Sequence, residues 1–535
     1  MAFHTNSSQQ YSLTDITNTL TTREKKAMEN SWAKIFAEEI FPFIDEGRFH
    51  VLYSTRTQCR SNTPVNICVG ALIIKELFQI SDDEVVENLM LDPRYQYALH
   101  TTSYEEQPLS DKTLSRFRKR CYDYESAYGT NLMHECVADL SSKIAKMMNI
   151  NPRMKRMDSL MIEANIKNLS RAELLYTCVA KLVAYIHKEN RNDILEGLEH
   201  YYNPNDFNQT FYYNDSTGTD ERIHSILCDA EKLLELCNSD YDEITEYQLL
   251  IRCLSEQTVV QNSVRKLRNK EDGGFSSSML QNPADPDATY REKAGKKHRG
   301  YVANFEESVG ENGSVVTDYQ FEPNTYSDSQ FLKDHLQQTE SQKETTILIT
   351  DGAYSGAENT SLAAAKNIRL VTTDLTGKEV PDIYADFEMN KEGTRILKCP
   401  AGYSPKSCCC SSSNGHVHAS FIKELCLGCP HKDECRVKVY KNVCSVDLSA
   451  TAQYRAKTRR YMKTDEFKAF ARLRNGVETI PSILRSQYQV DRMAVRGKIR
   501  SGFFFGCKIA ALNVRKLLTF RNGLGHYAQN PLLAS

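Results

Sequence analysis

The chain has 535 residues, of which 40% are hydrophobic and 25% charged, with a formal net charge of −2. This length is too great for one simple core and predicts a globular protein of roughly two to four domains. No apolar run approaches the ~18 residues that span a bilayer, and the first residues lack a secretory signal, which argues against membrane and exported proteins and predicts a cytoplasmic location.

The charge is distributed unevenly along the chain. From Thr451 to Phe520 there are sixteen Lys and Arg against four Asp and Glu, a net charge of +12, so the remainder carries −14. A basic segment on an acidic protein indicates a local surface for a polyanion such as DNA. A solvated basic helix face is the alternative interpretation.

Residues 1–150 are predicted to form an all-helical, DNA-binding domain. VNICVGALIIKELFQISDDEVVENLML repeats its apolar residues with a helical period. The following PLSDKTLSRFRKRC offers Ser110 as the N-cap of a basic helix, which is similar to the second helix of a helix-turn-helix unit. A basic surface helix is the alternative. The candidate DNA contacts are Lys112, Arg116, Lys119 and Arg120.

Residues 151–380 alternate between predicted strands and helices. Residues 151–170 contain the strand RMKRMDSLMIEANI, and residues 171–284 are a helical insertion that ends in the flexible linker EDGGFSSSMLQNPADPD. Residues 285–380 return as two strands joined by a Gly-Asn turn, a capped helix, the strand TTILITD, another helix and a last short strand. This order predicts an α/β architecture with a parallel or mixed sheet.

Three acidic residues are candidates for catalysis. Asp158 lies inside an apolar strand, where an unpaired carboxylate is costly and should face a cation. Asp351 ends a buried strand before a Gly turn, the place where open α/β sheets have their sites. Glu478 follows Arg474 by four residues and precedes Arg485 by seven, so the three can share a helix face. Three such carboxylates can hold two divalent metals for phosphoryl transfer.

Each candidate also has an ordinary structural interpretation. Asp351 could simply begin a turn, Asp158 could lie on an edge strand facing water, and Glu478 could form a surface pair with an arginine.

Residues 381–450 are predicted to be a cysteine-rich insert with a structural zinc ion. Eight of the seventeen cysteines lie between Cys399 and Cys444. Cys426, Cys429 and Cys435 are closely spaced and Cys399 is the natural fourth thiolate, a set that favours tetrahedral Zn²⁺. An iron–sulfur cluster and free or oxidised thiols are alternatives. The competing ligands are Cys408, Cys409, Cys410, His416, His418 and His431; CCCSSSNGHVH is predicted to be a mobile loop.

The chain resembles the DDE transposases of bacterial insertion sequences. The segments that carry the resemblance are, in chain order, LSDKTLSRFRKR, DSLMIEANIKNLSR, KKHRGYVANFEE, DGAYSG, CPAG with CLGCPHKDEC, and VETIPSILR with RGKIRSGFFFGCKIAALNVRKL. The family's last motif often reads Tyr-x-x-Arg-x-x-x-Glu-x-x-x-x-x-x-Lys. Arg474 and Glu478 match it, whereas Ala471 occupies the Tyr position and Arg485 the Lys position.

The resemblance implies a fold and an activity. The fold class is α/β: a ribonuclease-H-like mixed sheet flanked by helices, interrupted by the helical and cysteine-rich inserts and preceded by the helical domain. Basic core helices would occupy residues 451–520 and a tail residues 521–535. Asp158, Asp351 and Glu478 would bind two catalytic Mg²⁺, and Arg474 and Arg485 would contact DNA phosphates.

The implied protein would act on double-stranded DNA, both element ends and target, as a homodimer. A nuclease without strand transfer and a domesticated, non-catalytic DNA-binding protein are the alternatives. The three carboxylates and two basic segments favour the transposase.

Overall fold

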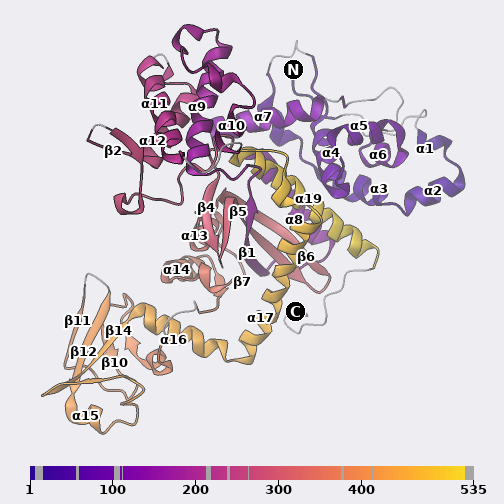
Figure 1. The fold of residues 1–535 in the computed structure, drawn as a ribbon. Coiled ribbons are helices and arrows are strands. Elements are labelled where there is room, and N and C mark those ends of the chain that lie inside the picture. The colour runs from indigo at the N-terminus through magenta and orange to yellow at the C-terminus, as the bar shows by residue number, and fades with distance from the viewer. Residues whose placement is uncertain are drawn as a thin grey trace.

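A mixed β-sheet lies at the centre of the computed structural model, with helices on both faces (Figure 1). The residues that the structure describes are 1–6, 16–55, 60–101, 109–110, 112–212, 218–237, 241–262, 264–293, 295–374, 379–411 and 415–523. Among these residues, no helix has both the length and the apolar character needed to cross a membrane.

The N-terminal region is helical, as predicted. Its α-helices are α1 (Ile16–Thr19), α2 (Thr22–Glu29), α3 (Trp32–Ile35), α4 (Val65–Phe78), α5 (Asp82–Leu91), α6 (Pro93–Ala98), α7 (Thr113–Tyr128) and α8 (Leu132–Met147). Most of α4 is buried because it packs against the C-terminal helix α19 (Lys498–Arg521). Side chains from α4, α7, α8, α19 and three core strands form one hydrophobic cluster, so the helical region and the sheet share a core.

The basic helix α7 differs from the prediction at its start. It begins at Thr113 after Lys112, and Ser110 binds the Thr113 hydroxyl instead of capping the helix. The connection from α6 spans residues 99–112, far longer than the turn of about three or four residues in a helix-turn-helix unit. The resemblance to that unit is therefore not confirmed.

The core sheet has the strand order β4-β5-β1-β7-β8, with β6 also paired to β5. Its strands are β1 (Met154–Glu163), β4 (Thr289–Lys293), β5 (Lys296–Gly310), β6 (Gly313–Pro323), β7 (Thr346–Ile349) and β8 (Ile368–Val371). Strands β1, β7 and β8 are parallel, whereas β5 runs antiparallel to β1 and to β6. Helix α13 (Asp328–Gln338) connects β6 to β7, and helix α14 (Ala357–Ala365) connects the parallel strands β7 and β8.

The insertion after β1 is a separate helical unit with its own hydrophobic cluster. It contains α9 (Arg171–Lys188), α10 (Asp206–Phe211), α11 (Thr219–Cys237) and α12 (Thr245–Gln257), followed by a hairpin of β2 (Thr258–Gln261) and β3 (Val264–Leu267). The predicted flexible linker that follows is anchored, because Leu280, Asn282 and Asp285 are buried.

The cysteine-rich region forms a second, smaller sheet with the order β11-β12-β14-β13. Its strands are β11 (Ser407–Cys410), β12 (His416–Ile422), β13 (Lys438–Val439) and β14 (Val443–Ser449), with α15 (Lys423–Leu427) between them and the pair β9 (Glu388–Met389) and β10 (Ile396–Lys398) beside them. The prediction that CCCSSSNGHVH forms a mobile loop is wrong for the two ends of this segment, which belong to strands β11 and β12. Residues 412–414 lie outside the described part of the chain.

The C-terminal region returns the chain to the core through α16 (Ala450–Met462), α17 (Asp465–Asn475), α18 (Thr479–Ser486) and α19 (Figure 1). Many of its cations pair with acids from elsewhere in the chain. Lys508 binds Glu76 and Lys516 binds Glu307, while Arg455, Arg460 and Lys463 pair with aspartates that precede the small sheet. The +12 segment is therefore only partly available to a polyanion.

A network of charged side chains links strands β1, β5 and β6 to helices α8 and α13. His335 lies 3.0 Å from Glu306 and 3.3 Å from Asp318, whose carboxylate also accepts from His134. Lys155 lies 2.8 Å from the other oxygen of Glu306. The two carboxylates outweigh burial and raise the pKa of His335 to about 10, and the facing cations lower the pKa of Glu306 to about 2 despite its burial.

Protonated His335 should therefore stabilise the fold in a defined pH range. Its unfolded pKa is near 6.5, so this stabilisation is complete below about pH 6.5 and is lost as the pH rises toward 10. We expect His335→Gln to lower the melting temperature most at pH 6.5 and least near pH 10. Thermal melts of both proteins over this range measure the effect; a constant difference would contradict the ion-pair assignment.

Candidate active site

Asp158 lies in the middle of the sheet, on β1 between β5 and β7. It pairs with Phe305 and shares its sheet face with Arg156, two residues earlier. Its Oδ1 accepts a hydrogen bond of 2.8 Å from the Ser159 amide. Burial raises the pKa of Asp158 to about 6; the Ser159 amide and Arg474 oppose this rise, and the nearby Asp351 adds to it. The positive charge near Asp158 therefore does not offset the effect of burial on its carboxylate.

Asp351 directly follows the neighbouring parallel strand β7, as predicted. It caps the short 3₁₀ helix Gly352–Tyr354, and its Oδ1 accepts a hydrogen bond of 2.6 Å from the Ala353 amide. Its other oxygen lies 3.7 Å from Nη2 of Arg474, and 36% of the side chain is exposed. The sheet therefore brings Asp158 and Asp351 together, and both side chains are partly exposed to solvent.

Arg474 lies at the end of α17 and faces both aspartates. Its charge favours the ionised form of Asp158 while it lies beside Asp351. Its Nε is buried and has no hydrogen-bond partner among the described residues. A buried donor without a partner is costly and indicates a place for an oxygen-rich ligand such as a phosphate.

Glu478 follows Arg474 by one turn but does not continue its helix. The chain forms the 3₁₀ turn η10 (Gly476–Glu478) between α17 and α18, and Pro481 lies in the first turn of α18. The prediction that Arg474, Glu478 and Arg485 share one regular helix face is therefore wrong. Glu478 is exposed and makes no hydrogen bond or ion pair with described residues.

The turn η10 nevertheless packs over the face of β1 that carries Asp158. Nη1 of the buried Arg156 donates a hydrogen bond of 2.6 Å to the Leu473 carbonyl, and its Nε donates to Glu307 across the sheet at 2.6 Å. Gly476 passes so close that a Cβ there would overlap the Arg156 guanidinium. Arg156 lies two residues before Asp158 on β1. It thus holds the segment that carries Arg474 and Glu478 against this part of the strand.

The described residues contain no group of three or more His, Cys, Asp or Glu side chains arranged to hold a metal ion. The two aspartates and Arg474 are brought together, whereas Glu478 is not drawn into contact with them. The other acids that are near in sequence have structural partners: Asp285 accepts from Tyr301, Asp287 from the Lys498 amide, Asp465 pairs with Lys468, and Asp491 binds Arg485.

Arg485 holds protein groups. Its Nη2 donates to the Met161 carbonyl at 2.9 Å and its Nε to Asp491 at 3.1 Å, while Asp491 also accepts from the Glu163 amide. These bonds tie α18 to the end of β1. The expectation that Arg485 is aimed at phosphate does not match this arrangement.

Sequence reasoning missed Tyr354 and Asn304. The fully buried Tyr354 donates to Oδ1 of Asn304 at 2.7 Å, which ties the loop after Asp351 to β5. Burial raises the pKa of Tyr354 well above its usual value, and the carboxylates of Asp328, Asp158 and Asp351 raise it further. The signal was an aromatic residue three positions after Asp351 in DGAYSG.

The predicted DNA contacts on α7 differ in their surroundings. Lys112 and Arg116 are exposed and pair with no described residue, whereas Lys119 lies 3.2 Å from Asp123. Arg120 lies over the Tyr53 ring, 4.8 Å from its centroid. Arg116 is thus the clearest cation on this helix for a phosphate.

The four predicted zinc ligands line one small pocket. Cys399, Cys426, Cys429 and Cys435 surround it together with His431. Burial, followed by neighbouring thiols, raises the pKa of Cys426 to about 11 and that of Cys435 to about 12. Cys426 also contacts Cys444, which sequence reasoning did not include. Four thiols are a suitable ligand set for zinc. Among the described residues, however, their sulfur atoms are not arranged around one metal position.

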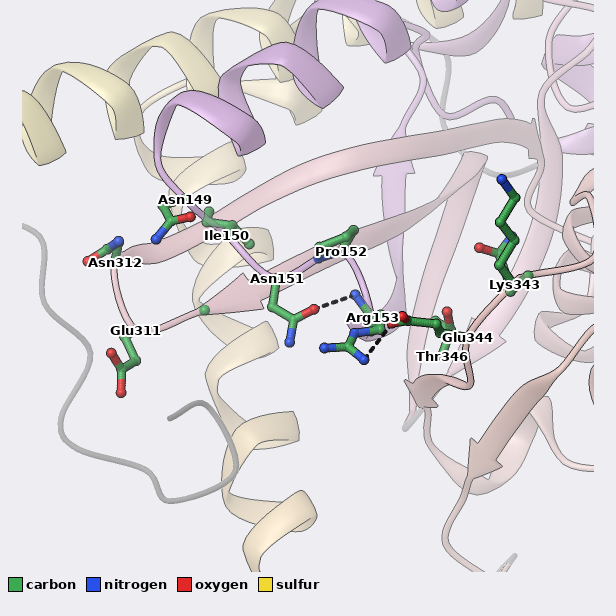
Figure 2. A pocket seen from close by; sticks show the side chains of 12 residues that line it. Asn149, Ile150, Asn151, Pro152, Arg153, Glu311, Asn312, Lys343, Glu344 and Thr346 are labelled. Atoms are coloured by element: carbon green, nitrogen blue, oxygen red, sulfur yellow. Dashed lines mark hydrogen bonds and ion pairs between the residues drawn. The ribbon is translucent and has the colours of Figure 1, made fainter. Parts of the chain in front are cut away.

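A cavity of about 750 Å³ lies elsewhere among the described residues (Figure 2). It opens beside the N-terminal ends of β1 and β7, the opposite edge of the sheet from Asp351. Figure 2 shows Arg153 lying between Asn151 and Glu344, with its guanidinium paired to Glu344 at 2.7 Å. No candidate catalytic residue lines this cavity.

Comparisons with known proteins match two regions of the chain to transposase families. A family described as "Transposase DDE domain" matches residues 398–518, which contain Arg474, Glu478 and the four cysteines but neither aspartate. A family described as "Transposase domain (DUF772)" matches residues 22–120 and includes the first part of α7. No protein with a curated description matches the chain.

A solved structure, the piggyBac transposase synaptic complex with hairpin DNA, is matched at 7% identity and a TM-score of 0.29, covering 95% of this chain and 78% of that one. A TM-score this low supports no conclusion about fold or function. From the two family matches, this protein has a transposase DDE domain at residues 398–518 and an N-terminal DUF772 transposase domain at residues 22–120.

Proposed function

We propose that the chain is the DNA transposase of an insertion sequence. It would bind terminal inverted repeats, cut the DNA and join the freed end to target DNA, with Asp158, Asp351 and Glu478 as its catalytic carboxylates. The observation that carries the proposal is the meeting of Asp158 and Asp351 on adjacent parallel strands, with Arg474 beside them and the Glu478 turn over the same sheet face.

The strand order also supports a ribonuclease-H-like core. A hairpin pairs antiparallel to the first strand, and two further parallel strands follow on its other side. Asp158 in the first strand and Asp351 after the next parallel strand are the positions where this arrangement brings carboxylates to one edge.

The two aspartates fit divalent magnesium. Asp158 is half-buried without a directly bound cation, and Asp351 further disfavours its ionisation, so a cation between them would relieve both effects. Two bound Mg²⁺ would supply Lewis-acid chemistry for an in-line displacement at phosphorus. Glu478 would complete the ligands by a small movement of η10, and Arg474 would hold a phosphate oxygen.

The protein's own groups orient the DNA in this scheme. Arg474 has a free buried Nε next to Asp351, so a phosphate that enters there is placed beside both aspartates. Arg156 and Gly476 keep that arginine in register with β1. Cutting and joining would both occur at this one site, on a homodimer that pairs two element ends.

Two kinds of arginine should give opposite effects when removed. Arg474→Ala should slow cleavage of bound DNA and change end binding little, because Arg474 lies beside the aspartates. Arg116→Ala should weaken end binding and reduce its salt slope by about 0.9, because Arg116 is exposed on α7. Gel shifts over a salt series, with cleavage of pre-bound DNA, separate the two. Arg472→Ala, at an exposed neighbour on α17, is the control. Loss of end binding in Arg474→Ala, with unchanged end binding in Arg116→Ala, would contradict the assignment of these two arginines to cleavage and to end binding.

The cysteine pocket is proposed to bind structural zinc, apart from catalysis. We expect Cys429→Ser to remove zinc and unfold the small sheet locally, since the four thiols share one pocket. Metal analysis of the purified protein and limited proteolysis measure both effects. Cys409→Ser, at an exposed thiol on β11, is the matched control; protein with neither zinc nor iron would contradict the site.

A nuclease that only cleaves is the alternative function. Incubating the protein with DNA that flanks its own gene, in Mg²⁺ and in EDTA, distinguishes the two. The proposal predicts Mg²⁺-dependent cuts at the element ends and products in which those ends are joined to a second duplex. Cleavage without joined products would favour the nuclease, and no Mg²⁺-dependent cleavage would contradict both.

A further inference from the structure

The hairpin of β2 and β3 is packed at its base and exposed toward its turn. On one face Thr258 is buried and Arg265 lies 3.1 Å from Glu231 of α11, while Val260, nearer the turn, is 58% exposed. Pairing of Gln261 with Val264, and of Val259 with Lys266, puts these residues on the other face. There Val264 is 52% exposed, and Gln261 and Lys266 are also exposed.

The base of the hairpin is held firmly. Arg171 of α9 donates to the carbonyls of Gln257 and Arg268 and to the Gln257 side chain. Arg268 in turn donates to the carbonyls of Ser255, Thr258 and Gly273. These bonds tie both ends of the hairpin to the helices, so the exposed ribbon is presented on a fixed support.

The hairpin also reverses the charge of the unit that carries it. Residues 171–257 contain seventeen acidic and seven basic residues, a net charge of −10, whereas residues 258–272 contain four basic and two acidic residues, a net charge of +2. Lys266 and Lys270 are exposed and pair with no described residue. Acidic helices repel DNA, so a duplex approaching the insertion would meet the hairpin.

We propose that this two-stranded ribbon enters a groove of the DNA that the protein binds. The major groove of B-DNA admits a two-stranded ribbon, and this face offers an apolar contact in Val264 and phosphate-binding cations in Lys266 and Lys270. The amide nitrogen of Gln261 donates to Asp272 at 3.2 Å, so the side chain offers its carbonyl oxygen as an acceptor. The inference rests on the proposed function, since it names a second DNA contact of the transposase apart from α7 and the carboxylates.

Binding of full-length protein to duplexes from the DNA flanking its gene, measured by fluorescence anisotropy in Ca²⁺ over a salt series, tests the inference. Lys266→Ala with Lys270→Ala should reduce the salt slope by about 1.8. Val264→Ser should weaken binding severalfold with the slope unchanged. Lys188→Ala at the exposed end of α9 and Val439→Ser on β13 are matched controls and should bind as the native protein does.

The outcomes separate this inference from the proposed function. Native binding and Mg²⁺-dependent cleavage with all hairpin variants unchanged would overturn the ribbon contact and leave the transposase standing. Absence of any DNA binding would overturn both. A change in oligomeric state by light scattering in Val264→Ser, with DNA binding intact, would mean that the face meets a second copy and would also overturn it.

Discussion

Replacing Asp351 by Asn is expected to reduce DNA cleavage and joining by at least about 10³-fold while leaving end binding nearly unchanged. The substitution keeps the size of the side chain and its hydrogen bond from the Ala353 amide, but removes the charge that a divalent metal needs. Asp158→Asn should have an effect of the same size, because the two carboxylates lie on adjacent strands and act together.

Glu478→Gln should follow the two aspartates, and Glu466→Gln provides the control. Glu466 is another exposed acid of the same region, paired with Arg369 rather than turned to the site. Single-turnover cleavage of pre-bound DNA is the measurement. If Glu478→Gln behaves like Glu466→Gln and keeps full activity, a different third ligand must complete the site.

Replacing Arg156 by Met is expected to destabilise the fold by about 3–5 kcal/mol, the usual cost of breaking a buried ion pair from one side. Arg156 and Glu307 are both almost fully buried; burial raises the pKa of Glu307, but the charges of Lys516 and then Arg156 outweigh it and lower that pKa to about 2. Loss of the guanidinium also removes the donor to the Leu473 carbonyl, so the Arg474 and Glu478 segment should shift and activity should fall.

A double variant separates these two effects of Arg156. Arg156→Met with Glu307→Gln removes the buried carboxylate that would otherwise be paired with Lys516 alone. It should recover part of the stability, but not the activity, because the bond to Leu473 is still missing. Lys516→Met is the comparison, since Lys516 binds the same carboxylate at 2.7 Å from a more exposed position. Calorimetric melting and cleavage rates measure both; equal losses in stability and activity for Lys516→Met would contradict the positioning role.

The central strands could be predicted from sequence because their signals are local. Apolar and β-branched residues fill β1, β7 and β8, and the Gly turn after Asp351 identifies the end of a strand. The two aspartates were found for that reason. Their meeting depends on β1 and β7 being neighbours, which the strand and helix order favours in an α/β sheet.

The features that were missed depend on residues far apart in the chain. The break between α17 and α18 follows from Gly476 fitting against Arg156 of β1. Arg485 is committed to Met161 and Asp491, and the +12 segment is neutralised by acids such as Glu76 and Glu307. Each partner lies beyond the reach of a helix or turn pattern, so composition overstated the free positive surface.

The predicted loops failed for a similar reason. Cys408–Cys410 have no strong strand propensity by themselves, and they form β11 because β12 pairs with them. The Gly- and Ser-rich segment after the hairpin is held by Leu280 packed into the insertion and by Asp285 bound to Tyr301. Turn-forming residues therefore predicted where the chain changes direction, but they did not predict whether the segment is mobile.

Anomalous scattering from Mn²⁺ in crystals of the protein bound to an element end tests the central claim most directly. Mn²⁺ takes the oxygen ligands of Mg²⁺, so its position reveals the catalytic carboxylates. We expect density between Asp158 and Asp351, with Glu478 as the third acidic ligand after η10 has moved toward them. Density bound instead by Asp285 and Asp287, or none near Asp158 and Asp351 while DNA is cut, would contradict the assignment of the active site.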